Sequence, residues 1–281
     1  MNLSFKLITV RRRWCAAVLC WLIAIPHSLE AQDSTATQIQ YLPGTKIFPL
    51  FTADARAHQF SLSKITEKRE WIGAVGASVP VIQLDVSNVS VQASVAATIF
   101  NRLIKKPGHL EVYTIDYKVD FPVDIRIARL ALRVAAGHIS CHFADDAIEL
   151  YGERSIQHVN DYITLAAAYD VAAIQGYLYA GANYSYGTQP IPNKPWLLQA
   201  GGDVGNIALN EFLSVYGAID LKIKEEVGWG STRSFQIGCK LFPRSQHQLR
   251  IAYTLRMGFE ERGQFYLKKE TVNLISAFLD F

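Results

Sequence analysis

The chain has 281 residues with a formal net charge of +3, and half of its residues are hydrophobic. This length fits one large domain or two small ones. Beyond the first residues, no run reaches the ~20 apolar residues of a membrane-spanning helix, which excludes a bundle of such helices.

The N-terminus has the pattern of an export signal. Lys6 and three arginines (residues 11–13) precede the apolar run WCAAVLCWLIAI, and the small residue Ala31 follows. This pattern predicts a signal peptide over residues 1–31. An uncleaved anchor and a lipid-anchored Cys20 remain as alternatives. Removing residues 1–31 takes four of the 28 basic residues and one of the 25 acids, leaving 24 of each. The basicity is therefore no argument for nucleic-acid binding, and we expect no nucleic-acid partner.

Residues 32–56 differ in character from the chain that follows. A polar tail, QDSTATQIQ, leads into YLPGTKIFPLFTADARA, which has two prolines, a glycine and no clean alternation. We expect a periplasmic segment folded against the mouth of the next domain, because Tyr41, Phe48 and Phe51 favour packing over a disordered leader.

From about residue 58, apolar and polar residues alternate. In EVYTIDYKVDF, for example, tyrosine, isoleucine, valine and phenylalanine interleave with threonine, lysine and aspartate. Successive strand side chains point to opposite faces, so each segment has one apolar and one polar face. The segments run for ~10–14 residues, longer than the 5–6 typical of soluble strands and close to the 9–11 of membrane barrels. We predict an all-β fold, an antiparallel transmembrane β-barrel over residues 57–281, with a soluble β-sandwich as the alternative.

The alternation predicts about twelve strands. Their expected ranges are 57–67, 70–84, 88–101, 109–120, 123–139, 156–169, 172–186, 195–206, 210–224, 231–243, 247–258 and 270–281. With both termini in the periplasm, short inner turns fall at 85–87, 121–122, 170–171, 207–209 and 244–246. Longer outer loops alternate with them, as in outer-membrane barrels. The last strand ends on Phe281, a terminal aromatic that resembles the signal read by the barrel-assembly machinery.

Charged residues on the polar face are expected to point into the barrel. They carry both signs: Asp116, Lys118, Asp120, Arg129, Arg133, Asp220, Lys222, Lys240, Arg250 and Arg256. In a narrow barrel such groups should pair across the interior, because an unpaired buried charge is costly. This argues against a wide pore. The two cysteines left after signal removal, Cys141 and Cys239, are expected to be free thiols.

Three motifs occur in an order that resembles one protein family. They are PLFTADAR (49–56), GHISCHFADD (137–146) and NKPWLLQAGGDVG (193–205). Together they resemble a bacterial family catalogued as domain of unknown function 1207, over about residues 49–281. The chain departs from that pattern at Cys141, Ala144 and Asp146, where the family tends to serine, glycine and glutamate. The resemblance implies an exported outer-membrane barrel and no particular activity.

The GHISCHFADD run carries the main candidate site. Strand parity places His138 and Ser140 on the lipid-facing side of the outer rim. A His-x-Ser pair there resembles outer-membrane phospholipase A and lipid A deacylase, in which histidine is the base, serine the nucleophile and a third polar group orients the histidine. Glu153 is the candidate for that third role, with Asp145 and Asp146 as alternatives.

The same run allows two other interpretations. His138, His142, Asp145 and Asp146, with Glu149 nearby, supply nitrogen and oxygen ligands for a divalent metal, although without a standard spacing. The third interpretation is a polar surface loop whose acids and histidines bond one another and Arg154.

The sequence favours an outer-membrane protein of a Gram-negative-type bacterium in contact with outer-membrane lipid. We expect a structural envelope component or a narrow solute conduit. The alternative is a lipid hydrolase of the phospholipase or lipid A deacylase kind. The sequence specifies no cofactor and no oligomeric state.

Overall fold

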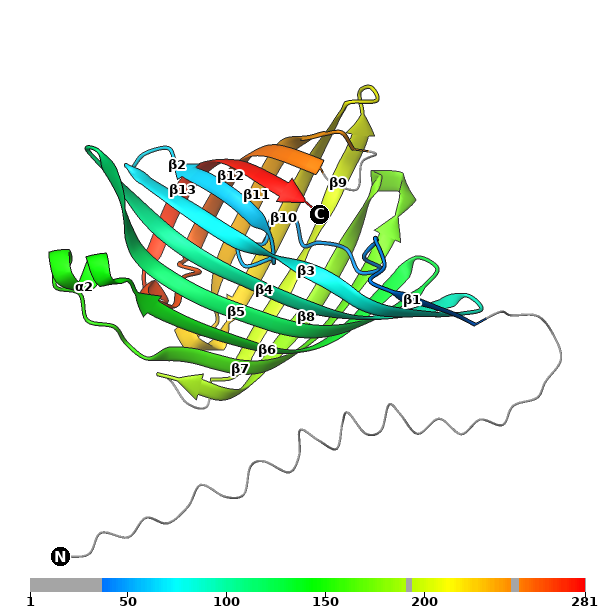
Figure 1. The fold of residues 1–281 in the computed structure, drawn as a ribbon, viewed down its shortest axis with the longest axis horizontal. Helices are drawn as coiled ribbons and strands as arrows, with labels where there is room; N and C mark the ends of the chain where they lie inside the picture. The colour runs from blue at the N-terminus through cyan, green and yellow to red at the C-terminus, as the bar shows by residue number, and fades with distance from the viewer. Residues whose placement is uncertain (1–36, 191–193, 244–247, 281) are drawn as a thin grey trace, which may run out of the picture. The chain divides into compact units, whose positions relative to one another are not determined.

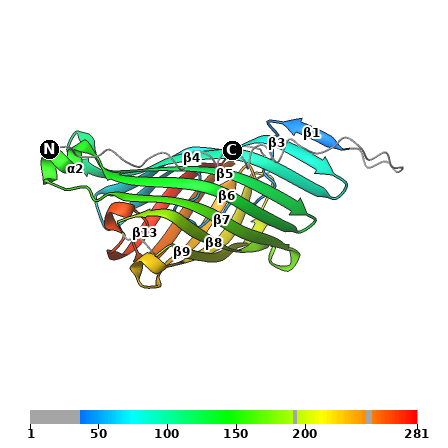
Figure 2. The same cartoon turned by 90° about the horizontal axis from the view of Figure 1, so that it is seen from below.

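The computed structural model describes residues 37–190, 194–243 and 248–280. The predicted signal peptide and Phe281 lie outside these ranges. Within them, twelve antiparallel strands form one closed sheet, in which each strand pairs with its neighbours in sequence and the last pairs with the first. Figures 1 and 2 show the sheet closing on itself as a barrel. The predicted all-β barrel is confirmed.

The twelve barrel strands account for most of the described chain. They are β2 (Phe60–Ile65), β3 (Glu70–Val86), β4 (Val89–Lys106), β5 (His109–Ile127), β6 (Leu130–Phe143), β7 (His158–Val171), β8 (Gly176–Gln189), β9 (Trp196–Ala208), β10 (Leu213–Lys224), β11 (Gly230–Leu241), β12 (Gln248–Phe259) and β13 (Lys269–Asp280). We call the end where β2 begins and β13 ends the inner end, and the opposite end the outer end.

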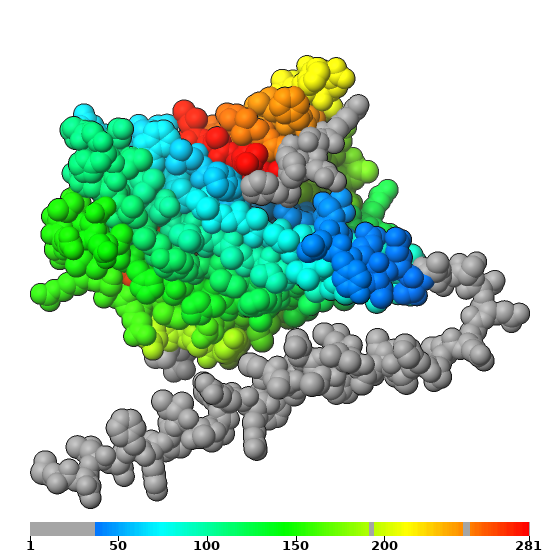
Figure 3. All heavy atoms as spheres, in the orientation of Figure 1, coloured from blue at the N-terminus to red at the C-terminus, as the bar shows by residue number. Residues whose placement is uncertain are grey.

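A thirteenth strand lies outside the closed ring. Strand β1 (Gln38–Tyr41) pairs with the last residues of β3, from Gln38 opposite Asp85 to Tyr41 opposite Ile82. Figure 3 shows this blue stretch beside the cyan β3–β4 hairpin at the inner end. The chain then turns back toward the barrel before β2 starts.

Closure of the barrel depends on a short first strand. β2 has six residues, whereas β3 to β5 have 17 to 19. It pairs with β13 from Phe60 opposite Leu279 to Ile65 opposite Leu274. Closing the ring leaves no sheet edge with unpaired N–H and C=O groups, which lipid could not satisfy.

Side-chain exposure follows the predicted alternation. In β11, Phe235 and Ile237 are exposed on the outside, whereas Ser234 and Gln236 are buried inside. The outer wall is thus apolar and the lumen polar. Nine of the ten charges predicted to face the lumen do so. Arg129 does not, because it lies exposed in the turn between β5 and β6.

The turn predicted at 121–122 is wrong. β5 continues through Phe121 and Pro122 to Ile127, and the chain turns at Ala128 and Arg129. Proline has no N–H to give to a ladder. The β4–β5 pairing is interrupted at this point, between Ala93 opposite Val123 and Ala96 opposite Asp120, so Pro122 fits inside a strand.

The outer end carries the one α-helix in the described part of the chain. Helix α2 (Asp145–Tyr151) follows β6 and ends at Gly152, which has a left-handed backbone with φ of 68°. Three single-turn 3-10 helices, η1 (Ala172–Ile174), η2 (Glu225–Val227) and η3 (Gly263–Phe265), lie in other connections. The outer connection between β6 and β7 therefore contains a helix. No described helix has the length and apolar character needed to cross a membrane.

Both described cysteines are free, as predicted. Cys141 on β6 is buried and faces the lumen, whereas Cys239 on β11 is half-buried. The wall therefore relies on strand pairing and interior contacts.

Candidate functional site

The lumen is filled from the inner end by residues 42–59, which we call the inserted segment. Its residues Thr52, Asp54, Arg56 and His58 alternate with alanines and contact different parts of the wall. The alanines fit because the segment lies against side chains: Ala53 and Ala57 are both buried. The sequence predicted packing at the mouth, but the contacts lie inside the barrel.

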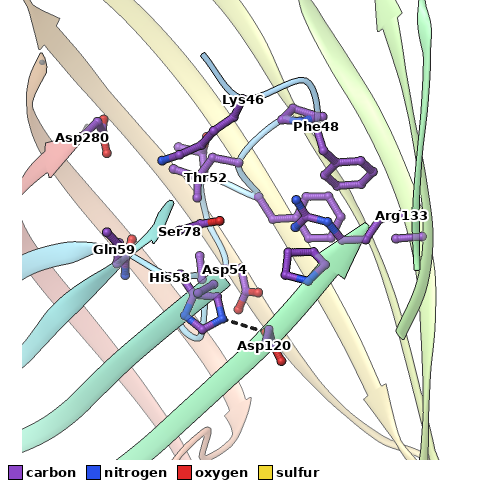
Figure 4. A pocket seen from close by; sticks show the side chains of 18 of the residues that line it. Lys46, Phe48, Thr52, Asp54, His58, Gln59, Ser78, Asp120, Arg133 and Asp280 are labelled. Atoms are coloured by element: carbon purple, nitrogen blue, oxygen red, sulfur yellow. Dashed lines mark hydrogen bonds and ion pairs between the residues drawn. The ribbon is translucent and has the colours of Figure 1, made fainter. Parts of the chain in front are cut away.

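Four polar contacts fix the inserted segment to the wall. Thr52 Oγ1 donates to Asp203 Oδ2 at 2.5 Å. Asp54 forms an ion pair with Lys222. These contacts reach β9 and β10. On the other side, Arg56 pairs with Asp116 at 2.5 Å and His58 with Asp120 at 2.7 Å, both on β5. Figure 4 shows His58 directed at Asp120, with Asp54 close by. The segment thus bridges opposite walls.

Aromatic contacts hold the earlier part of the inserted segment. The ring of Phe51 stacks on Tyr179 of β8, with centroids 3.7 Å apart and planes at 6°. The guanidinium of Arg133 lies 4.1 Å from the centre of the Phe48 ring; the two side chains lie together in Figure 4. The Tyr177 hydroxyl donates to the carbonyl of Leu50. Such contacts add to the apolar burial of the rings.

The outer end supplies a second group of interior residues from the β12–β13 connection. Glu261 is buried and pairs with Lys222 at 2.7 Å and Lys224 at 3.2 Å. Its backbone carbonyl accepts from Arg56 Nε at 2.8 Å. The inserted segment and this loop therefore meet at Lys222 and Arg56. The predicted charge pairing is present. Many of the pairs, however, join a wall strand to the inserted segment or to the β12–β13 loop, rather than one wall strand to another.

The electrostatics of the inserted segment favour the charged forms of its acids. Burial alone would raise the pKa of Asp54, but the neighbouring Lys222 and Lys118 outweigh burial and bring that pKa below its usual value. Glu261 behaves likewise: burial opposes ionisation, and Lys222 and Lys224 still lower its pKa. Both acids are therefore ionised at neutral pH and hold the lysines that they contact.

Unlike these two acids, His58 is favoured in its neutral form. Burial, and then the charge of Lys118, lower its pKa, while its hydrogen bond to Asp120 raises it by a smaller amount. The neutral imidazole suits the site, because one ring nitrogen can donate to Asp120 while the other accepts from Thr98 at 3.0 Å. His58 is thus neutral at neutral pH.

The lumen contains an inner cavity and an outer cavity, besides a smaller one of about 30 Å³ beside Ala53. The inner cavity, about 530 Å³, is lined by Lys46, Arg133, Asp203 and Arg250 among others. The outer cavity, about 120 Å³, is lined by residues that include Trp196, Lys224 and Gly263. The side chains that line both cavities are those of Asp54, Lys118, Tyr162, Asn183 and Gln199. These five residues, which we call the septum, stand between the inner and the outer cavity.

The predicted rim site lies on the outer wall near the outer end. His138 and Ser140 project from β6 on the outward face, as parity predicts, and the His138 side chain is 47% exposed. Its Nδ1 atom lies 2.7 Å from Oδ1 of Asp161 on β7, and the two residues are cross-strand partners. The carboxylate beside His138 is thus Asp161, which the sequence did not single out.

The other predicted site residues have different partners. Glu153 accepts a hydrogen bond from the Tyr113 hydroxyl, and Asp146 Oδ2 accepts from the backbone N–H of Val112 at 2.7 Å. Asp145 begins helix α2. His142 is exposed, with its ring near that of Tyr117.

The predicted metal ligands His138, His142, Asp145 and Asp146 do not gather into a centre. Across residues 37–190, 194–243 and 248–280, no group of three or more His, Cys, Asp or Glu side chains is placed to hold a metal ion. The polar-loop interpretation agrees better with the contacts of Asp146 and Glu153.

Sequence reasoning missed two features for which a signal existed. The run T-A-D-A-R-A-H (52–58) alternates polar residues with alanine, a pattern that suits a segment enclosed by polar walls. Asp161 lies on the outward face of β7, where an acid interrupts an apolar series that includes Ile163 and Leu165. Its pairing with His138 required the β6–β7 register, which the sequence did not supply.

Comparison with known proteins identifies a family and no activity. Residues 23–280 match the family described as protein of unknown function (DUF1207), which confirms the predicted resemblance. No curated protein matches the chain. Among solved structures, a crystal structure of a variant of OccD1 (OprD) is similar, at 11% identity over 75% of this chain and 74% of that one, with a TM-score of 0.31.

Proposed function

Because the chain belongs to the DUF1207 family, whose description gives no function, we propose from the geometry of the chain itself that it is an outer-membrane barrel acting as a narrow, normally closed solute conduit. The observation that carries this proposal is the septum, which separates two cavities with charged residues in their linings inside one barrel.

The outer wall supports the membrane location. Large apolar side chains such as Val134, Leu165 and Ile237 are exposed there. A soluble protein rarely exposes apolar surface on this scale, whereas a membrane barrel presents such a belt to lipid. The N-terminal pattern of an export signal agrees with this location.

The lumen supports a conduit over a purely structural role. A wall needed only for structure could fill its interior with apolar side chains, but this interior has charged side chains and a cavity of about 530 Å³. A polar lumen is the usual interior of a barrel that passes water-soluble molecules. Passage requires movement of the septum, because Asp54 and Lys118 line both cavities.

The test is single-channel conductance of the refolded protein in planar bilayers. We expect rare, small openings for the wild type. The double variant Arg56→Gln/Asp116→Asn neutralises one contact between the inserted segment and β5. If the variant lowers the free energy that favours the closed state by about 1.4 kcal/mol, the open probability should increase about tenfold.

A control pair keeps the result specific. Arg102 on β4 and Glu70 on β3 form an ion pair that lines neither cavity. Arg102→Gln/Glu70→Gln should leave conductance unchanged. Folding of each variant is checked by circular dichroism and by the gel mobility of unheated samples. If folded wild type and folded Arg56→Gln/Asp116→Asn both conduct nothing, the conduit is excluded and a structural role is favoured.

A further inference from the structure

The outer rim carries three side chains that suggest an activity separate from conduction. Ser140 and His138 project from the outward face of β6, and Asp161 lies directly across from His138 on β7. We propose that Ser140, His138 and Asp161 form a hydrolytic site for the acyl esters of membrane lipids, with Ser140 as nucleophile, His138 as base and Asp161 as the group that orients the base.

The contact between His138 and Asp161 sets the tautomer that this chemistry needs. The Nδ1 atom of His138 lies 2.7 Å from Asp161 Oδ1. A carboxylate only accepts hydrogen bonds, so in the neutral imidazole Nδ1 carries the proton and Nε2 keeps its lone pair. An acid on Nδ1 and a free Nε2 is the arrangement by which a carboxylate prepares histidine to take a proton from serine.

Ser140 has the placement of a nucleophile for this base. Residues two apart on a strand point to the same face, about 6.6 Å apart along the chain, and a hydroxyl and an imidazole can meet over that spacing. In enzymes without bound substrate this contact is often long and closes on binding.

Gly187 provides a second, independent indication that Asp161 is positioned. Gly187 on β8 is the cross-strand partner of Asp161. A side chain at Gly187 would begin 2.9 Å from Asp161 Oδ2. The Asp161 carboxylate thus occupies the space that a side chain at position 187 would need. Glycine at this position leaves room for the carboxylate where it contacts His138.

The position of the three residues indicates the class of substrate. Asp161 is 42% exposed on the outer wall, where a charged side chain facing lipid is costly at mid-membrane and costs little near the interface. Along β7 the next outward residues are Ile163 and Leu165, which are apolar and exposed. The site therefore lies where the acyl chains of a lipid meet its head group, which is where the acyl ester bonds are.

The reaction balances without a cofactor. Ser140 Oγ attacks the ester carbonyl carbon as its proton passes to His138 Nε2, and Asp161 stabilises the resulting imidazolium. The carbonyl–oxygen bond to the lipid alcohol then breaks, and the alcohol leaves with that proton, giving an acyl-serine. Water attacks the acyl-serine with His138 again as base, which releases a fatty acid and restores the serine.

The test uses the full mature chain refolded in detergent. Fatty-acid release is measured from mixed micelles of phosphatidylethanolamine and, separately, from purified lipid A, with and without divalent cations. Release from only one of them identifies the source of the ester. Covalent labelling by a fluorophosphonate, located by mass spectrometry, reports the nucleophile independently of turnover.

The variants separate catalysis from folding. Ser140→Ala should abolish labelling and lower fatty-acid release by about 10³-fold or more, and Asp161→Asn should lower release about 10²-fold or more by disturbing the tautomer. Two control variants on the outer wall, Ser231→Ala on β11 and His142→Ala on β6, should retain both the labelling and the fatty-acid release. Conductance should be unchanged in Ser140→Ala.

Two results would overturn the proposal. One is folded wild type that neither releases fatty acid nor takes up label under any of these conditions. The other is release or labelling that persists in Ser140→Ala, because the serine would then not be the nucleophile.

Discussion

At the scale of single residues, closure of the lumen depends on how four side chains of the inserted segment are paired. Arg56, Asp54 and His58 each have a partner of suitable charge or hydrogen-bonding capacity on the wall. Leaving a buried charge without its partner costs several kcal/mol, so these contacts hold the segment only while each partner keeps its protonation state.

His58 makes the stability of this closure depend on pH. Its pKa is lowered in the folded protein, chiefly by burial, so the unfolded chain binds more protons as the pH falls. Stability is therefore complete above the ordinary histidine pKa and decreases as pH falls through it. We expect the urea midpoint of unfolding to decrease between pH 7.5 and 5.5.

The variant His58→Gln isolates this effect. Glutamine keeps a donor and an acceptor but does not titrate, so the decrease over that pH range should be reduced. The acids Asp54 and Glu261 have lowered pKa values and lose their contribution only at more acidic pH, as each becomes protonated. An equal decrease in wild type and His58→Gln would show that another group is responsible.

Gly137 tests how tightly the septum is packed. It faces the lumen on β6, and a methyl group there would overlap Asp120 Oδ1 and the ring of Tyr162, which are hydrogen-bonded at 2.7 Å. We expect Gly137→Ala to lower the free energy of unfolding by ~1–3 kcal/mol, the range for overpacking. Gly217→Ala is the control, because its methyl would meet the nearest side chain at an ordinary 3.4 Å. Similar unfolding curves for both variants would contradict the packing described.

At the scale of elements, the sequence predicts the strands well because each has one apolar and one polar face. Eleven connections follow from the same alternation, and the observed turns at the inner end lie close to the predicted ones with one exception. The exception is instructive. Pro122 resembled a turn signal, but its missing N–H is harmless where the ladder to β4 is already interrupted.

An insertion distinguishes the two possible turns. A short epitope placed between Ala128 and Arg129 enters an exposed turn, and the barrel should still fold. The same epitope between Phe121 and Pro122 enters β5 and should prevent folding. The assay is the heat-dependent gel mobility typical of a folded barrel. If the protein with the 121–122 insertion folded and the one with the 128–129 insertion did not, the turn would lie at 121–122, as the sequence predicted.

The candidate sites show where alternation stops being informative. Parity predicted that the side chains of His138 and Ser140 point outward, because side chains alternate between the two faces along one strand. It could not identify Asp161, since the neighbour of His138 depends on the register between β6 and β7. Nor could it place Thr52 or Arg56 inside the lumen, because their partners lie on strands distant in sequence.

At the scale of the whole molecule, the barrel is a closed wall whose interior is occupied by its own N-terminal chain. The inserted segment enters from the inner end, and the loop with Glu261 approaches from the outer end. They meet at Arg56 and Lys222, so movement of the segment would join the inner and outer cavities. The proposed lipid site on the outside of the same wall would work without any such movement.

The central claim, that the inserted segment closes the lumen, is tested most directly by tethering it. Phe51 and Tyr179 stack with ring centroids 3.7 Å apart. In a background with Cys141→Ser and Cys239→Ser, the variant Phe51→Cys/Tyr179→Cys can therefore be joined by a short, reducible bis-methanethiosulfonate cross-linker. The measurement is single-channel conductance before and after reduction. The account predicts a silent cross-linked protein that begins to open when the linker is cleaved; the same conductance in both states would contradict it.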